Sequence, residues 1–231
     1  MWSRAFLSPF GYSVLNTTVV ASRRSHCMQG IEQHFWCEVR RIVHHIVYCI
    51  VCISMVNLCI VSYNPQCAWT YDRLVDICDV CHKAHILALA GTSKKQISSE
   101  CEQRRFKQYQ VLEWGWTNDR GSNKSCGVSL LINNKVFPKI NAVFSPPKCI
   151  AGRAGAVRMK RADLDVLAIV CYFAPDQSKH SHREANLQIC KWVRALCGRM
   201  PNRCCILLTG DFNAKSALDP SGFIGNVHTR L

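Results

Sequence analysis

The chain has 231 residues, of which 48% are hydrophobic and 19% are charged. This length and composition suit a globular domain with a sizeable core and exclude a disordered chain. The formal net charge is +14, from 29 Lys and Arg against 15 Asp and Glu. Such an excess favours a polyanionic partner, either nucleic acid or an anionic membrane surface.

The first 55 residues show no clear pattern, and we treat them as an N-terminal extension whose role is uncertain; the interpretable domain occupies 56–231. An apolar stretch runs from Ile42 to Val61, but its continuous part is shorter than the roughly 20 residues that cross a bilayer. No clear membrane span results, and a membrane-associated basic protein is a minor alternative. We expect Val56 to Tyr63 to form a buried strand instead.

A helix and a second strand are expected next. Thr70 can cap a helix that begins at Tyr71, and apolar residues then recur at helical spacing at Leu74, Ile77, Cys78 and Cys81. The apolar run His85 to Ala90 predicts another strand, which ends at Gly91. If the two strands are parallel, their carboxyl ends meet at one edge of a sheet.

The middle of the chain is harder to assign. Residues 96–123 are polar, and we expect a loop with one weak strand. Within it Trp114 and Trp116 either stack on nucleic-acid bases or, as is more common for two aromatics in a strand, pack in the core. A strand is expected at 126–133, and residues 154–159 and 164–173 predict a hairpin.

The last elements lead to the most informative stretch. A polar loop is expected at 176–183 and a helix from Glu184 to Gly198, with Gly198 as its C-cap. The run C-C-I-L-L-T from Cys204 then predicts a buried strand that leads into Gly210, Asp211, Phe212 and Asn213. Taken alone, these polar residues suit either a site at the sheet edge or an ordinary turn.

The chain has 16 cysteines. The first 15 residues lack the apolar core of a secretory signal, so we expect an intracellular protein, with the nucleus as one option, and not a secreted one. The cysteines are then small core residues. Two C-x-x-C pairs, Cys49 with Cys52 and Cys78 with Cys81, could suggest zinc, as could the nearby histidines; we favour core packing because both pairs lie in apolar surroundings.

Five motifs occur in order along the chain: S-Y-N at 62–64, I-L-A-L-A-G-T at 86–92, G-V-S-L-L-I-N at 127–133, C-Y-F-A-P at 171–175 and L-T-G-D-F-N-A at 208–214. In this order they resemble the endonuclease/exonuclease/phosphatase superfamily, and above all the endonuclease domains of non-LTR retrotransposons. The resemblance implies an α+β fold, a four-layer α/β/β/α sandwich with its site at one sheet edge. It also implies Mg²⁺-dependent cleavage of phosphodiester or phosphomonoester bonds, with DNA or another phosphodiester as the partner.

The resemblance also implies roles for single residues. Asn64 matches an Asn beside the metal that helps to position metal and phosphate, and Tyr172 matches a Tyr that contacts the scissile phosphate. Asp211 matches the Asp that orients or activates the attacking water, and Asn213 matches an Asn that donates to phosphate oxygens. Hard oxygen ligands and fixed donors are what a phosphate centre with Mg²⁺ requires.

Two departures from the family pattern affect the expected activity. The metal-binding Glu of the family aligns with Gly91, so this carboxylate is absent, although Mg²⁺ is held by only one or two protein carboxylates. The sequence also stops at Leu231, before a terminal Ser-Asp-His segment that supplies the acid/base His; His228 does not match that segment. We therefore expect a C-terminally truncated sandwich that is catalytically impaired or inactive.

Two alternatives stay open at this stage. Beside an impaired DNA endonuclease of the retrotransposon type, the chain could be a non-catalytic basic remnant that binds nucleic acid, as its net charge allows. The other alternative is a member of the phosphatase branch of the same superfamily. No residue pattern reads a particular base or head group, and no pattern predicts an oligomeric state.

Overall fold

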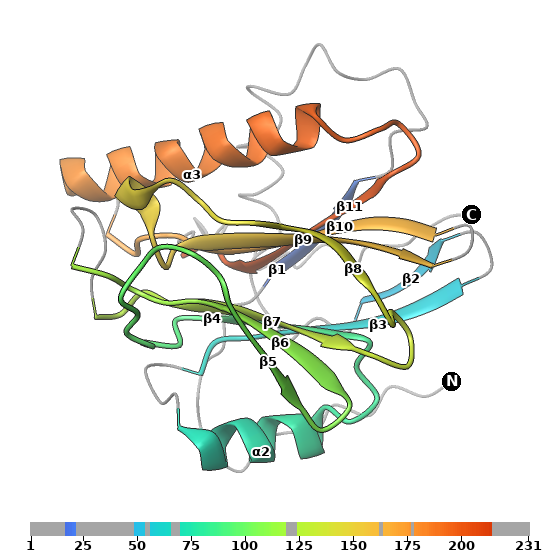
Figure 1. Ribbon diagram of the computed structural model, residues 1–231. Coiled ribbons are helices and arrows are strands. Elements are labelled where there is room, and N and C mark those ends of the chain that lie inside the picture. Colours follow the sequence, from blue (N-terminus) through green and yellow to red (C-terminus); the bar gives the residue numbers. More distant parts are fainter. Residues whose placement is uncertain are drawn as a thin grey trace, which may run out of the picture.

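A computed structural model describes residues 17–21, 49–53, 56–65, 70–118, 124–161, 164–176 and 178–213. In this part of the chain two mixed β-sheets lie face to face, and one α-helix covers the outer face of each sheet (Figure 1). The order of layers is helix, sheet, sheet, helix, in the α+β class. The described residues therefore show the layers expected of the sandwich.

One sheet has six strands in the order β2-β3-β4-β7-β6-β5. The helix α2 joins β3 to β4, as the spacing of the apolar runs predicted. These two strands are parallel, and the other neighbours are antiparallel. The elements are β2 (Cys49–Ile53), β3 (Val56–Tyr63), α2 (Tyr71–Val80), β4 (Ile86–Ala90), β5 (Glu102–Phe106), β6 (Tyr109–Trp114) and β7 (Val128–Asn133).

The other sheet has five strands in the order β1-β11-β10-β9-β8. It contains a second strand–helix–strand unit, because β10 and β11 are parallel and are joined by the helix α3. The elements are β1 (Thr17–Ala21), β8 (Ile140–Phe144), the short 3₁₀ helix η1 (Lys148–Ile150), β9 (Ala154–Arg161), β10 (Leu164–Tyr172), α3 (His180–Gly198) and β11 (Cys205–Asp211).

The central strands are apolar along their whole length because both of their faces are covered. In β7, Leu130 packs in the core between the sheets, whereas its neighbour Leu131 packs under α2. In β10, Ala168 faces the other sheet and Ile169 packs under α3. Successive side chains of a strand point to opposite faces, so a continuous apolar run indicates a strand buried on both sides.

The beginning of α2 was predicted correctly. Thr70 is its N-cap, and its hydroxyl accepts a hydrogen bond from the backbone N–H of Arg73 at 3.2 Å. Such a cap satisfies one of the unpaired N–H groups of the first turn. The buried residues Leu74, Ile77 and Cys78 form the expected apolar stripe.

Three expectations about secondary structure were wrong. The polar segment at 96–123 contains two strands, β5 and β6, where a single weak strand was expected, and β8 was not foreseen. Both β5 and β8 lie at sheet edges, where polar side chains are tolerated on both faces and no apolar pattern arises. The helix α3 begins at His180 instead of Glu184 and includes Gly198, and Arg199 is its C-cap.

Val56–Tyr63 is a strand, as expected, and its Leu58, Ile60 and Val61 are buried. Two segments of the first 55 residues add an edge strand to each sheet: β1 pairs with β11, and β2 pairs with β3. The division of the chain at residue 55 stays a prediction, and His228 lies outside the described residues. Among those residues, no helix is long and apolar enough to cross a membrane.

Eleven of the described cysteines are seen as free thiols. The cysteines Cys78, Cys126, Cys171, Cys204 and Cys205 are buried, as expected of core residues, whereas five others are partly buried and Cys149 is exposed. Cys78 is a residue of α2 and lies in the core between this helix and the sheet, and Cys81 packs against the same core. Burial raises the pKa of the Cys78 and Cys81 thiols to about 11. Both thiols are therefore protonated near neutral pH.

Candidate active site

The carboxyl ends of β3, β4, β10 and β11 meet at one edge of the sandwich. Each parallel pair is joined by a helix that returns the chain to the start of the next strand, so both strands of a pair end at the same edge. A hydrogen bond of 2.6 Å from Asn64 Nδ2, after β3, to Asp211 Oδ2, at the end of β11, joins the two sheets there. The expected convergence of strand ends is thus observed.

Asp211 is the carboxylate of this edge and is only 4% exposed. Its Oδ2 accepts the hydrogen bond from Asn64, and its Oδ1 accepts one of 2.9 Å from the backbone N–H of Asn213. Burial raises the pKa of the Asp211 carboxyl, and the two hydrogen bonds oppose this shift. The charge is costly to bury, and both of its oxygens are held in place by donors.

Gly210 allows Asp211 to reach its position. A Cβ atom at Gly210 would lie 1.9 Å from the backbone oxygen of Cys171 in β10, and the backbone of Gly210 has a φ of +132°. Only glycine tolerates both conditions. The close approach of β11 to β10 sets Asp211 directly opposite Tyr172 in the parallel register.

Tyr172 lies half-buried at the end of β10, beside a buried arginine. The guanidinium carbon of Arg153 is 6.0 Å from the centroid of the Tyr172 ring, and Arg153 is 2% exposed. Burial and the nearby Asp211 charge raise the pKa of the Tyr172 hydroxyl, which therefore stays protonated and can donate a hydrogen bond. Sequence reasoning missed Arg153, because nothing in G-R-A-G distinguishes a buried arginine from an exposed one.

Gly91 lies between the other residues of the site. A Cβ atom built on Gly91 would be 2.8 Å from Asn64 Oδ1 and 3.4 Å from Tyr172 Cε2. A side chain at this position would therefore enter the site, and glycine supplies no ligand there. The backbone φ of +77° lies in the left-handed region, which favours glycine.

Asn213 is fixed by the loop that follows β10. Its Nδ2 donates a hydrogen bond of 2.5 Å to the backbone oxygen of Phe173. This uses one of the two amide protons and leaves the other for an anionic ligand. The structure thus brings together Asn64, Gly91, Tyr172, Asp211 and Asn213, the residues that the sequence singled out.

A second unforeseen residue, Asn186 of α3, holds this loop. Asn186 is 4% exposed; its Oδ1 accepts from the backbone N–H of Ala174 at 2.8 Å, and its Nδ2 donates to the Ala174 oxygen at 3.3 Å. The neighbouring Phe173 donates its backbone N–H to the backbone oxygen of Asp211 at 2.8 Å. A polar residue on the apolar face of a helix was the signal available in the sequence.

The donor set at this edge was compared with what Mg²⁺ requires. Asp211 supplies the single carboxylate among the five predicted site residues, and Asn64 Oδ1 is a second hard oxygen. In the described part of the chain, no group of three or more His, Cys, Asp or Glu is arranged to hold a metal ion. Mg²⁺ uses one or two carboxylates together with water and substrate phosphate. Asp211 supplies one carboxylate, but both of its oxygens accept hydrogen bonds from Asn64 and Asn213, so these residues as arranged do not form a Mg²⁺ site.

The buried Asp211 predicts an unusual dependence of stability on pH. Its pKa is raised in the folded state, so the folded protein holds a proton that the unfolded chain has lost, and stability falls as pH rises above the ordinary value of 3.8. Asp211→Asn removes this loss. Urea unfolding in metal-free buffer at a series of pH values should show the variant gaining stability over the wild type as pH rises.

Asp165 provides the matched control, because its pKa shift has the opposite sign. Arg158 donates two hydrogen bonds to it, of 2.8 and 2.6 Å, and lowers the pKa of its carboxyl. Its stabilising effect is present above the ordinary value of 3.8 and is lost in acid. Asp165→Asn should therefore lose stability relative to the wild type as pH rises; the same trend in both variants would contradict the pKa assignment of Asp211.

The two hydrogen bonds between the Asn186 side chain and the Ala174 backbone yield a second prediction. Asn186→Ala leaves a buried N–H and a buried carbonyl without partners, which should lower the free energy of unfolding by about 1–3 kcal/mol. Gln188→Ala removes an amide of the same helix that donates an exposed hydrogen bond to Glu184, and its effect should stay within about 0.5 kcal/mol. The free energy of unfolding is measured by chemical denaturation. Equal losses of this free energy in the two variants would show that the hydrogen bonds of Asn186 do not stabilise the fold.

Comparison with known proteins gives structural matches only. No protein-family model and no curated protein sequence matches the chain. A humanized TDP2 of D. rerio matches with a TM-score of 0.47 and 12% identity, over 72% of this chain and 66% of that one. The endonuclease domain of TRAS1, a telomere-specific non-LTR retrotransposon, matches with a TM-score of 0.42 and 17% identity, over 71% and 66%.

The catalytic domain of human Nocturnin, solved with a bound sulfate anion, matches with a TM-score of 0.43 and 13% identity, over 65% of this chain and 61% of that one. The chain therefore spans less than two thirds of the length of each of these three structures. At such identities the likeness concerns the fold, and the chemistry of the site has to rest on its own residues. The chain thus matches in structure several members of the endonuclease/exonuclease/phosphatase superfamily, the family that its sequence motifs resemble.

Proposed function

We propose that the chain is a phosphodiesterase-type domain of the retrotransposon endonuclease branch, that DNA is its substrate, and that its hydrolytic activity is impaired. One observation carries the proposal. Gly91 lies beside Asn64 and Tyr172 at the edge that also holds Asp211, so the position that faces the site contributes no carboxylate. The arrangement for binding a phosphodiester is retained, and the donor set for a metal is incomplete.

The remaining side chains suit a phosphate group. The Tyr172 hydroxyl and the free amide proton of Asn213 are donors for phosphoryl oxygens, and Arg153 adds a buried positive charge behind the tyrosine ring. Fixed donors of this kind stabilise charge that develops on phosphate oxygens. Asp211 can accept a hydrogen bond from an attacking water and orient it.

The expected rate is low. Mg²⁺, when bound in proteins of this type, neutralises the developing phosphate charge, and the carboxylate that would help to hold it is absent at position 91. General acid/base catalysis contributes a further 10²–10⁴-fold, roughly, in enzymes that have it. We infer that binding survives better than hydrolysis.

A second candidate function is binding of nucleic acid without catalysis, which the net charge of +14 favours. The two functions differ in their products, since binding alone leaves a supercoiled plasmid intact. Hydrolysis of a simple phosphomonoester without plasmid nicking would instead favour the phosphatase branch. For either DNA-directed function we propose an intracellular site of action, the nucleus being where DNA is met; the free thiols of the described residues support a reducing compartment.

Gly91→Glu tests the proposal by supplying the missing carboxylate. The substitution should cost at least about 1 kcal/mol of stability, because φ is +77° and the new Cβ would lie 2.8 Å from Asn64 Oδ1. It should nevertheless increase Mg²⁺-dependent nicking of supercoiled plasmid at least about tenfold over the wild type, since a metal ligand contributes several kcal/mol to such a transition state. The measurement is plasmid relaxation on agarose gels, with and without a chelator.

Gly91→Gln is the matched control, because it has the same shape and strain but no charge, and it should give no gain. Adding Asp211→Ala to Gly91→Glu should abolish the nicking. Strong nicking by the wild type that disappears in Asp211→Ala would show that the site is not impaired. A folded Gly91→Glu variant without any gain would show that position 91 is not where a metal ligand is missing.

A further inference from the structure

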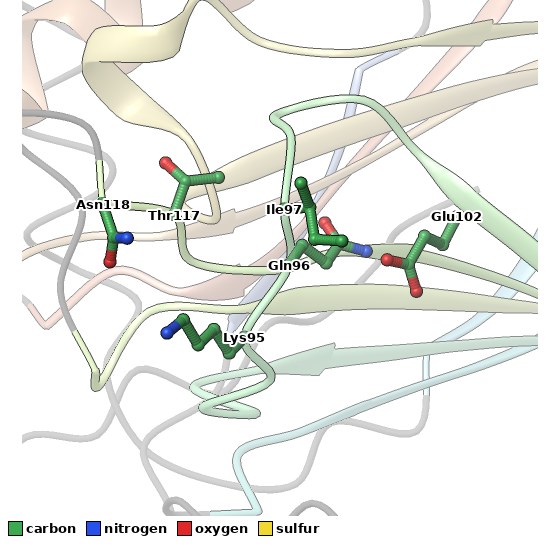
Figure 2. A pocket seen from close by; sticks show the side chains of 6 residues that line it. All are labelled: Lys95, Gln96, Ile97, Glu102, Thr117 and Asn118. Atoms are coloured by element: carbon green, nitrogen blue, oxygen red, sulfur yellow. The ribbon is translucent and has the colours of Figure 1, made fainter.

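A hollow of about 640 Å³ lies along the loops that leave the site edge. Its lining residues are Lys95, Gln96, Ile97, Glu102, Thr117 and Asn118 (Figure 2). They belong to the segment between β4 and β5, to the start of β5 and to the segment after β6. The residues Ala90, at the end of β4, and Trp114, at the end of β6, both pair with Val128 of β7, so the loops that line the hollow leave the same sheet edge as Gly91.

We propose that this hollow is a subsite for one unpaired nucleotide of a nucleic-acid strand whose phosphodiester lies at the site edge. The inference rests on the proposed function and specifies its substrate as a nucleic acid with an unpaired nucleotide next to the phosphodiester. A volume of about 640 Å³ is in the usual range for sites that take small organic groups.

The floor of the hollow is rigid. Gln96 is 5% exposed; its Nε2 donates to the Glu113 backbone oxygen at 3.0 Å, and its Oε1 accepts from the Gly115 N–H. The backbone N–H of Gln96 donates to the Trp116 oxygen at 2.9 Å, and the Trp116 N–H donates to the Lys94 oxygen at 2.8 Å. The two loops are thus bonded to each other, and a ligand would meet a surface that is already ordered.

Among the described residues near the hollow, Lys95 is a cation without a carboxylate partner. Lys94 Nζ contacts Glu102 at 2.6 Å and the buried Glu113 at 2.7 Å, and Arg104 Nε contacts Glu113 at 3.0 Å. Both carboxylates are thereby neutralised. Lys95 forms no ion pair with any described carboxylate, and its ammonium lies 5.3 Å from the centroid of the Trp116 ring. The hollow therefore presents a positive charge held over an aromatic ring, which suits a phosphate.

Two further side chains match the other parts of a nucleotide. Asn118 is exposed, and its side chain makes no hydrogen bond within the described residues, so its donor and acceptor are available to the edge of a base. Ile97 is fully exposed, at 104%, and offers an apolar contact for the face of a base. A cation, a free amide and an apolar contact in one hollow match the phosphate, the edge and the face of an unpaired nucleotide.

Trp114 does not contribute to the hollow. Trp114 is 1% exposed and lies in the core between the sheets, so of the two tryptophans only the half-buried Trp116 reaches the hollow's surroundings. Its Nε1 donates to the Ser93 oxygen at 3.0 Å. This bond fixes the ring, which in turn positions the Lys95 ammonium.

Binding is tested with a fluorescein-labelled oligothymidylate and a duplex of the same length, in metal-free buffer with a chelator so that no hydrolysis occurs. Fluorescence anisotropy should show about tenfold weaker binding of the single strand by Lys95→Gln, as expected for loss of one charge-assisted contact. The slope of log affinity against log salt should decrease by about 0.7, the value for one phosphate on a single strand. Asn118→Ala and Ile97→Ser should each weaken binding by about three- to tenfold.

The matched controls are Lys83→Gln and Val80→Ser. Val80 is the last residue of α2, and Lys83 lies between α2 and β4, so both precede the amino end of β4, whereas Gly91 follows its carboxyl end. Both side chains are exposed, and binding should not change. Circular dichroism of all variants should match the wild type, because none of the five residues lies in the core. Equal losses in the controls, or no loss in the three hollow variants, would overturn the subsite, as would a wild-type chain that binds neither probe.

The failures of the two proposals can be told apart. If Gly91→Glu nicks plasmid while the hollow variants bind the strand normally, the phosphodiesterase assignment stands and the subsite is wrong. If the hollow variants bind weakly while no variant nicks, the subsite stands and the hydrolytic assignment is wrong. Losses confined to the duplex probe would overturn the assignment to an unpaired nucleotide.

Discussion

The hydrogen bond between Asn64 and Asp211 joins the two sheets at the edge where their parallel strands end. It satisfies a carboxylate that is almost fully buried, and the backbone N–H of Asn213 satisfies its other oxygen. A buried carboxylate without partners would be costly, so this edge is stable only while the strands from both sheets are in register. The site is for this reason a product of the sandwich and not of any single motif.

The supports of that edge lie at some distance in the sequence. Gly210 lets β11 approach the β10 backbone, and Asn186 of α3 holds Ala174, next to the residue that anchors Asn213. Each support holds backbone atoms of the edge in place. The donors at this edge are thus ordered before a ligand arrives, which lowers the cost of binding.

Gly91 has the position of a site residue but supplies no chemical group. The strand β4 ends beside Asn64 and Tyr172, as a metal-dependent phosphodiesterase edge would require. The residue at this position is Gly91, however, and it has no side chain to reach into the site. Its left-handed backbone shows that the local conformation now depends on glycine. A carboxylate introduced at this position would therefore carry backbone strain.

The sequence by itself determined the α+β class and the two strand–helix–strand units, and it named candidate residues for the site. Continuous apolar runs and the Thr70 cap mark these elements locally, and the strand-end motifs name Asn64, Tyr172, Asp211 and Asn213. Only the tertiary structure decided what surrounds them. The edge strands β5 and β8 lack an apolar pattern because both of their faces tolerate polar residues, and the roles of Arg153 and Asn186 arise from contacts between segments distant in sequence.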